Sequence, residues 1–414
     1  MNHSDANHFS HARRTFLVGL ILPGQPAGMV EEHLDELEQL ARSAGARVVG
    51  RAVQARKAPD AATFVGKGKA EEIGKAAGSL GADLLLFDDD LTAGQVKNLE
   101  DLTGLGTLDR SGLILEIFDQ RAQSREARTQ VELARLNYLL PRLTRRWSHL
   151  SRQAGGIGMR GGEGEKQLEQ DRRVLRARIR RLEGELGKIE RTRGVQRHGR
   201  RGLPIVALAG YTNAGKSTLF NRLTAAGTLV EDRLFATLDA KLRRGGIGAG
   251  SSVDESNGDG SDTAGAASAA GANGGGKVAV FADTVGFIRK LPHHLVSSFR
   301  STLGEITAAD LVLHVVDRSH PRWREQMEVA EAVLDDLGVE RARVITVFNK
   351  LDRVPAFEPR PPRQGEALWV SATTGDGVPA LRTEVARRLA TAGPIATAQS
   401  LPRGLPAPVG VPLR

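Results

Sequence analysis

The sequence predicts an α/β protein with a small N-terminal α/β domain, a long basic helical hairpin and a C-terminal domain with a mostly parallel sheet. Strand-like apolar runs alternate with amphipathic helix-like runs over residues 15–120 and again over residues 203–390, as in parallel sheets with crossover helices. Between them, residues 121–202 hold two long amphipathic segments around a Gly-rich stretch, which indicates a helical hairpin. We expect the two ends, 1–14 and 391–414, to be flexible.

Composition excludes several kinds of protein. The 414 residues are 40% hydrophobic and 26% charged, which is ordinary for a globular chain of roughly two to four domains. The absence of cysteine excludes disulfides, thiolate metal sites and cysteine nucleophiles. No apolar run reaches the roughly 18 residues of a transmembrane helix. We therefore expect no membrane insertion, a cytoplasmic location and a monomer in solution.

The N-terminal domain shows the alternation most simply. Leu34, Leu37, Leu40 and Ala41 recur at helical spacing, whereas the run Leu-Leu-Leu-Phe at 84–87 has the length of a buried strand. The expected strands are 16–22, 47–53 and 83–88, and the expected helices are 31–44, 69–79 and 92–102.

Positive charge is concentrated in the hairpin. Residues 121–201 contain 22 Lys and Arg against 9 Asp and Glu, an excess of 13, although the whole chain carries only +9. The expected helices are 124–143, which ends near a proline, and 166–193. Such an excess favours an RNA or DNA surface. The alternative is a solvated charged helix face.

The loop at the hairpin tip, residues 145–165, is the predicted RNA contact. Its basic side chains would neutralise phosphates, and its tryptophan either stacks on a base or pins the loop to the hairpin. The expected RNA-contacting residues are Arg145, Arg146, Trp147, Arg152 and Arg160.

The larger α/β domain opens on a phosphate-binding loop. Residues 210–217 match G-x-x-x-x-G-K-[ST], between an apolar strand at 205–209 and a helix at 217–223, which is the context the motif requires. Backbone N–H groups of such a loop surround phosphates at a helix N-terminus. Lys216 would reach the β- and γ-phosphates, and Ser217 would offer its hydroxyl to Mg²⁺.

Two further motifs indicate a guanine base. Residues 349–352 read Asn-Lys-Leu-Asp after an expected strand. The run resembles the base-recognition motif of guanine-nucleotide-binding proteins, a resemblance that implies that Asp352 accepts from N1 and N2 of guanine. Adenine has no N2 amino group, so a carboxylate at this position selects GTP. Asn349 is expected at the base edge and Lys350 along the ring. Ser371 and the residue after it follow another strand, where a backbone N–H would meet guanine O6.

The remaining motifs concern the metal and the γ-phosphate. Residues 283–286 read Asp-Thr-Val-Gly after an expected strand. Thr237 is the candidate switch threonine, the alternative being an ordinary loop threonine. We expect Ser217, Thr237 and Asp283 at Mg²⁺, and Lys216, Thr237 and Gly286 as the catalytic residues. The full set expected at the nucleotide is Gly210, Tyr211, Thr212, Asn213, Ala214, Gly215, Lys216, Ser217, Thr218, Phe235, Ala236, Thr237, Leu238, Asp239, Asp283, Thr284, Val285, Gly286, Asn349, Lys350, Leu351, Asp352, Ser371, Ala372 and Thr373.

Two residues affect the expected rate of hydrolysis. Phe287 follows Gly286 where Ras-like proteins place a water-orienting glutamine. An aromatic ring cannot orient water by hydrogen bonding, so intrinsic hydrolysis should be slow and stimulated by a partner. Asn213 resembles the loop asparagine that coordinates K⁺ in some GTPases; alternatively it satisfies the backbone of its own loop.

Residues 245–276 interrupt the larger domain. They contain 11 Gly, 7 Ala and 5 Ser, too little apolar surface to offset the entropy of ordering. We expect this insertion to be disordered.

Nearly the whole chain up to about residue 390 resembles the HflX family of ribosome-associated P-loop GTPases. The runs that carry the resemblance are 64–69, 108–115, 130–134, 164–173, 210–217 and 283–288. One run departs from the family, since 163–166 read Glu-Gly-Glu-Lys where Pro-Gly-Glu-Thr is usual.

The resemblance implies a GTPase that binds the 50S ribosomal subunit and its rRNA through the hairpin, splits stalled or idle 70S ribosomes, and couples GTP hydrolysis to release. The alternative function is an NTP-driven factor that remodels rRNA or assists ribosome assembly. A third reading, a nucleotide sensor that barely hydrolyses, is weakened by the joint presence of Lys216, Ser217, Thr237 and Asp283.

Overall fold

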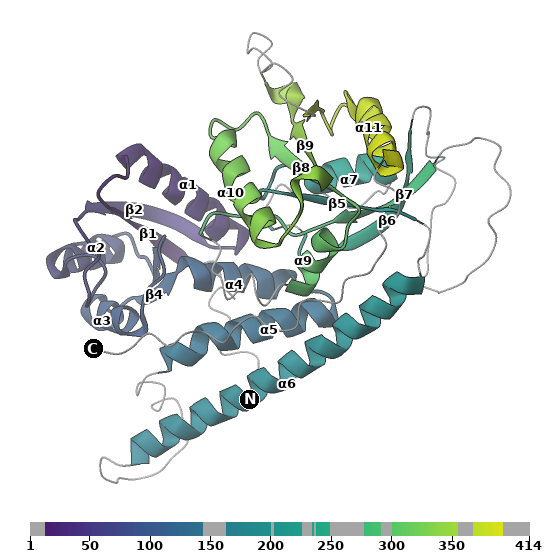
Figure 1. Cartoon of the computed structure of the whole chain (residues 1–414). Coiled ribbons are helices and arrows are strands. Elements are labelled where there is room, and N and C mark those ends of the chain that lie inside the picture. The colour runs from purple at the N-terminus through teal and green to yellow at the C-terminus, as the bar shows by residue number, and fades with distance from the viewer. Residues whose placement is uncertain are drawn as a thin grey trace.

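The computed structural model confirms the predicted fold class, with two parallel-rich sheets and a set of long helices (Figure 1). The described residues are 13–143, 163–199, 203–225, 234–235, 237–248, 277–290, 300–354 and 367–391. None of the helices in these ranges is both long enough and apolar enough to cross a membrane.

The N-terminal sheet has the order β2-β1-β3-β4, and all neighbouring strands are parallel. Its elements are β1 (Arg14–Ile21), α1 (Ala27–Ser43), β2 (Arg47–Ala55), α2 (Lys67–Ser79), β3 (Leu84–Phe87), α3 (Ala93–Thr103), β4 (Gly106–Asp109) and α4 (Arg110–Arg121). Six of these were expected, and their ends lie within four residues of the prediction. The sequence pattern missed β4, which has only four residues, and α4, whose first nine residues are all buried and therefore lack amphipathic periodicity.

The helical hairpin consists of α5 (Arg125–Leu139) and α6 (Glu163–Gly199), which lie side by side (Figure 1). The expected first helix was too long, because Pro141 converts its end into a short 3₁₀ turn, η1 (Leu140–Arg142). A small apolar cluster and a bidentate ion pair from Arg178 to Glu132, at 2.8 and 3.0 Å, join the two helices. The expected RNA-contacting residues Arg145, Arg146, Trp147, Arg152 and Arg160 lie outside the described residues.

The C-terminal sheet has the order β10-β9-β8-β5-β7-β6, with β6 antiparallel to its neighbour and the other pairs parallel. Its elements are β5 (Ile205–Gly210), α7 (Lys216–Thr224), β6 (Lys241–Ile247), β7 (Lys277–Asp283), α9 (Arg300–Thr307), β8 (Leu311–Asp317), α10 (Trp323–Asp336), η4 (Arg341–Arg343), β9 (Val344–Asn349), η5 (Leu351–Arg353), β10 (Leu368–Trp369) and α11 (Val378–Thr391). The parallel strands bring their carboxyl ends to one edge, where α/β sheets bind ligands.

The structure corrects the start of the predicted disordered insertion. Residues 245–247 form the end of β6, paired with β7. Here glycine serves close packing, because a Cβ on Gly245 would come within 2.5 Å of the Leu223 carbonyl oxygen and 2.8 Å of the Phe281 ring. Residues 249–276 lie outside the described ranges.

Candidate nucleotide and metal site

The loop between β5 and α7 depends on two glycines with positive φ. Gly210 has φ 146°, and a Cβ there would overlap the Val315 carbonyl oxygen. Gly215 has φ 90°, and a Cβ there would overlap the Asn349 amide. Side chains are excluded at both positions, so the backbone of the loop can approach a ligand closely.

Lys216 is buried at the centre of this loop. Its Nζ donates to the carbonyl oxygens of Tyr211, at 2.8 Å, and Gly210, at 3.2 Å. Burial lowers the pKa of Lys216 to about 8, because desolvation disfavours the ammonium form. Bound phosphates would favour that charged form and attract the same Nζ.

Three oxygen-bearing side chains meet beside Lys216. The Ser217 hydroxyl donates to Asp283 Oδ2 at 2.7 Å, and the Thr237 hydroxyl lies 3.0 Å from Ser217 Oγ and 3.2 Å from the same Oδ2. The structure thus brings together the three expected Mg²⁺ ligands, which come from α7, the segment before β6 and the end of β7.

This donor set fits Mg²⁺. Burial raises the pKa of Asp283 despite its hydrogen bonds with Ser217 and Thr237 and the nearby charge of Lys216, and its buried Oδ1 has no hydrogen-bond partner in the described structure. Mg²⁺ takes hard oxygen ligands and is commonly held by one or two carboxylates together with substrate phosphates. A single carboxylate with two hydroxyls therefore suits a metal whose coordination a nucleotide completes.

Gly286 lies against the phosphate-binding loop. A Cβ on Gly286 would come within 2.8 Å of Thr212 Cα and 2.9 Å of Lys216 Nζ. Two backbone hydrogen bonds hold this approach, from Thr212 N to the Phe287 carbonyl at 2.7 Å and from Phe287 N to the Gly210 carbonyl at 3.0 Å. The Phe287 side chain is 1% exposed and packs in the core, so it is unsuited to orient an attacking water.

The expected guanine-binding residues cluster at the ends of β9 and β10. Asn349 donates to the Ala214 carbonyl at 2.9 Å and accepts from Ala372 N at 3.0 Å, so it ties the phosphate loop to the loop after β10. Ser371 donates to Asp352 Oδ1 at 2.6 Å. Asp352 is otherwise exposed, which leaves its second carboxylate oxygen accessible to a base.

Lys350 and Asn213 lie on the two loops that are expected to surround the base and the phosphates. Lys350 Nζ pairs with Asp317 at 2.7 Å, and its Cε passes near Gly215. Asn213 is exposed at φ 59°, and no hydrogen bond joins its side chain to the described residues. The alternative that Asn213 satisfies its own loop therefore has no support in this geometry.

Comparison with known proteins identifies the family. Three family models match successive parts of the chain: "GTP-binding GTPase N-terminal" over residues 31–119, "GTP-binding GTPase Middle Region" over 121–200 and "50S ribosome-binding GTPase" over 205–350. GTPase HflX from Magnetococcus marinus is 42% identical, covering 92% of this chain and 83% of that protein. GTPase HflX from Escherichia coli is 44% identical, covering 86% and 79%. This chain belongs to the HflX family of GTPases.

The family assignment confirms the resemblance noted in the sequence and makes the protein a GTP-binding GTPase. Among solved structures, a GTP-binding protein from Sulfolobus solfataricus in complex with GDP matches 92% of this chain and 100% of that chain, at 21% identity and a TM-score of 0.43.

Several residues expected at the nucleotide of this HflX-family protein are buried or bonded within the protein in the described structure. Phe235 and Leu238 are buried in the apolar core, and Asp239 bonds to the start of the hairpin. Thr284 donates to the Leu208 carbonyl at 2.6 Å, and Val285 is buried. Thr218 and Leu351 are half-buried, Thr373 is exposed, and Ala236 lies outside the described residues.

Sequence reasoning missed Arg222 of α7. Its guanidinium donates to the Ala372 carbonyl at 3.2 Å and to the Thr373 carbonyl, which fixes the loop after β10. In the sequence Arg222 lies five residues beyond the end of the phosphate-loop motif and belongs to no motif itself, so no local signal could have found it.

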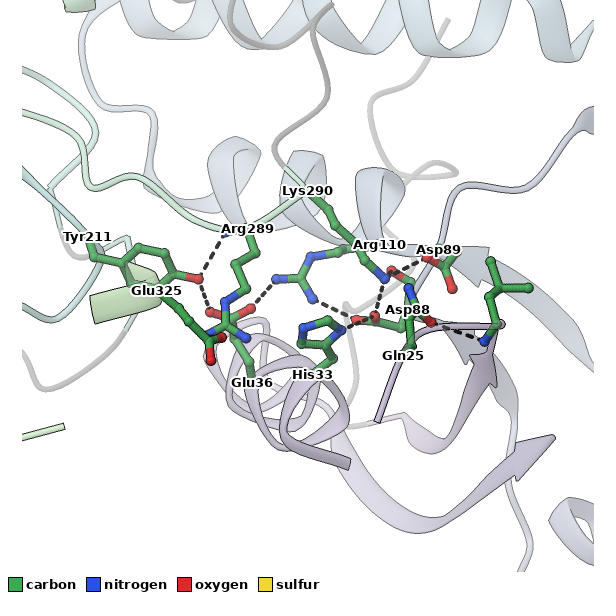
Figure 2. A network of polar contacts seen from close by, with 11 residues as sticks. Gln25, His33, Glu36, Asp88, Asp89, Arg110, Tyr211, Arg289, Lys290 and Glu325 are labelled. Atoms are coloured by element: carbon green, nitrogen blue, oxygen red, sulfur yellow. Dashed lines mark hydrogen bonds and ion pairs between the residues drawn. The ribbon is translucent and has the colours of Figure 1, made fainter. Parts of the chain in front are cut away.

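A buried ion network, also missed, lies at the boundary of the N-terminal and GTPase domains (Figure 2). At its centre Arg110 of α4, 2% exposed, pairs with Glu36 of α1 and with Asp88 after β3, the latter at 2.7 Å. Buried charges are tolerated where partners of opposite sign compensate them.

The GTPase domain completes this network. The Tyr211 hydroxyl donates to Glu36 and accepts from Arg289 N at 2.9 Å, and Lys290 pairs with Asp88 at 2.6 Å (Figure 2). Burial, followed by the charge of Glu36, raises the pKa of Tyr211 and keeps its hydroxyl protonated. The phosphate loop and the segment after Gly286 are therefore both attached to the N-terminal domain.

Proposed function

We propose that this HflX-family GTPase binds the 50S ribosomal subunit and its rRNA through the hairpin, splits stalled or idle 70S ribosomes in the cytoplasm, and is stimulated by the ribosome. The observation that carries the proposal is the charge of the middle region, where residues 121–201 hold an excess of 13 positive charges. A surface of this kind binds polyanions by neutralising phosphates. The family description of the GTPase domain, "50S ribosome-binding GTPase", supports the same partner.

The GTP site would work by positioning and by charge compensation. Backbone N–H groups of 210–217 and Lys216 would hold the phosphates, and Gly286 N–H would face the γ-phosphate. Ser217, Thr237 and Asp283 would hold Mg²⁺, which neutralises charge on the phosphates. Asp352 would select guanine.

The intrinsic rate should be slow, because the buried ring of Phe287 leaves no side chain at that position to orient water. We propose that Asn213, exposed and without a partner among the described residues, holds K⁺ beside the phosphates. Turnover in KCl should then exceed turnover in NaCl. Equal rates in the two salts would exclude this ion.

The testing experiment measures GTP turnover with and without purified 50S subunits in KCl, and 70S splitting by sucrose gradient. We expect strong stimulation by 50S that is lost when Arg145, Arg146 and Arg152 are all replaced by alanine. The matched control replaces three exposed arginines outside the hairpin, Arg42, Arg324 and Arg341, which removes the same charge. Absence of stimulation in the unaltered protein would contradict the proposal.

The alternative function, NTP-driven remodelling of rRNA or ribosome assembly, uses the same basic hairpin. It predicts strand separation of free rRNA in the absence of ribosomes. Splitting of 70S ribosomes without activity on free rRNA would favour the main proposal.

A further inference from the structure

Asp239, two residues after the switch threonine, bonds to the start of the helical hairpin. Its Oδ2 accepts from the backbone N–H groups of Gln123, at 3.2 Å, and Ser124, at 3.1 Å, and its Oδ1 bonds to the Ser124 hydroxyl. The same Ser124 oxygen accepts from Ala127 N at 3.0 Å and so caps α5. The carboxylate therefore lies at the positive end of a hairpin helix, where an anion is stabilised.

A second contact anchors this segment on the other side of the threonine. The Phe235 ring packs edge-on against Phe118 of α4, with centroids 4.8 Å apart, and both rings are buried. Phe235 has φ 57°, which is unfavourable for a bulky residue and persists only where the surroundings hold it. α4 is followed directly by the residues that Asp239 contacts, so both anchors lie at the α4–α5 junction.

Thr237 stands between these two anchors and faces the metal site. Its hydroxyl lies 3.0 Å from Ser217 Oγ and 3.2 Å from Asp283 Oδ2. In this short segment Thr237 therefore contacts the expected metal site, while Phe235 and Asp239, two residues to either side, contact the helices. Phe235 and Asp239 therefore join the segment that carries Thr237 to the α4–α5 junction.

The hairpin can act on this junction as one piece. α5 and α6 are joined by the Arg178–Glu132 ion pair and by the apolar cluster of Leu133, Ile179 and their neighbours. A change at the far end of the hairpin would thus reach residues 123–124 through packed helices.

We propose that Asp239 is a positioning residue that links the orientation of the hairpin to the position of Thr237, so that the target of the hairpin sets the hydrolysis rate through the Asp239–Ser124 contact. This inference rests on the proposed function for the roles of Thr237 and the hairpin. Binding linkage is reciprocal, so GTP also changes the affinity of the hairpin for its target.

The coupling is tested first without ribosomes, by amide hydrogen exchange of the full chain with GDP and with a non-hydrolysable GTP analogue. In the unaltered protein, exchange at Gln123, Ser124 and Ala127 should differ between the two nucleotides. In Asp239→Ala and Ser124→Ala the difference should vanish. Asp335→Ala, which removes an exposed carboxylate of the GTPase domain, should keep it. Identical exchange with both nucleotides in the unaltered protein would overturn the coupling.

Turnover with 50S subunits then tests the consequence. Ser124→Ala should keep its unstimulated turnover and its KM for GTP, while the stimulated kcat falls roughly tenfold. Asp239→Asn, which retains one acceptor oxygen, should fall less than Asp239→Ala. Full stimulation in both alanine variants would overturn the coupling. If 50S fails to stimulate the unaltered protein, the proposed function fails, and the exchange measurement alone decides the coupling.

Discussion

The two parallel sheets of this molecule use the same edge in opposite ways. In the GTPase sheet the carboxyl ends of β5, β7 and β9 carry the phosphate loop, Asp283 and Asn349, and these groups face a ligand site. In the N-terminal sheet the ends of β3 and β4 carry Asp88 and Asp109, which are bonded to cations of this same chain. On our proposal the first edge binds the nucleotide, whereas the second joins parts of the protein through ion pairs.

The difference lies in how the following helix begins. A five-residue loop separates β5 from α7, so the N–H groups at that helix start can meet phosphate. α4 begins directly after β4, and Asp109 itself accepts from Gly112 N at 2.9 Å, so a side chain already caps the helix. In this molecule the uncapped helix start lies at the expected phosphate site, and the helix start capped by Asp109 lies at the ion pairs.

Among the variants that test this comparison, Asp109→Ala should have the largest effect, a loss of folding stability. Asp109 is fully buried and bonds to Arg142 at 2.7 Å and to the Tyr138 hydroxyl at 2.8 Å. Its removal takes the ion-pair partner from the largely buried Arg142 and should lower the free energy of unfolding, measured by urea titration, by about 3–5 kcal/mol. Asp35→Ala, at an exposed ion pair with Arg51, should cost less than about 1 kcal/mol. Similar losses in the two variants would contradict this account.

At the carboxyl edge of the GTPase sheet, a substitution should reduce GTP turnover rather than folding stability. Gly286→Ala would place a methyl group 2.9 Å from Lys216 Nζ, and displacement of about 1 Å at a reacting centre costs roughly 100-fold in rate. GTP turnover should fall by about that factor. Gly304→Ala, in open space on α9, is the control. Unchanged turnover in Gly286→Ala would mean that this glycine does not face the γ-phosphate.

Lowering the pH should lower the free energy of unfolding of the GTPase domain because of His314 on β8. Both its ring nitrogens lack a partner among the described residues, and burial lowers its pKa to about 4. Between about pH 6.5 and pH 4 the unfolded state binds more protons, so stability falls as pH falls through this window. The loss at pH 5 should be about 2 kcal/mol. Urea titrations at pH 7 and pH 5 should show a smaller difference for His314→Leu, and an equal difference would refute this cause.

The smallest expected effects are those of replacing each of the two tyrosines of the chain by phenylalanine, and GTP turnover should distinguish the two variants. Tyr211→Phe removes the hydroxyl that joins Glu36 to Arg289 N, and Tyr138→Phe removes a bond to Asp109. Each should cost about 1–2 kcal/mol of stability. Only Tyr211→Phe should also alter GTP turnover, since it alone touches the phosphate loop. Equal turnover in both variants would show that the contact of the Tyr211 hydroxyl with the N-terminal domain does not affect GTP hydrolysis.

The sequence predicted those parts of the site that are motifs at the ends of strands. The phosphate loop, Asp283 and Asn349 each lie at a strand end, so the parallel sheet had to bring them together. The partners of Glu36, Asp88 and Arg110 are distant in the sequence, and these residues look like ordinary surface charges there. Asp239 was expected at the nucleotide because of its neighbour Thr237, yet its partners lie about 115 residues earlier. Contacts between domains carry no periodicity or spacing by which a sequence pattern could reveal them.

The bridge between Tyr211 and Phe287 begins a run of four residues that crosses the boundary between the two domains. Phe287 is held to the loop after β5 by two backbone hydrogen bonds and therefore moves with the sheet. Lys290 is bound to Asp88 and Asp89 and therefore moves with the N-terminal domain. Ile288 and Arg289, which lie between these attachments, are held as well: Ile288 is buried in the apolar core, and Arg289 pairs with Glu325 and donates its backbone N–H to the Tyr211 hydroxyl. The four residues after Gly286 therefore act as a brace across the boundary of the two domains.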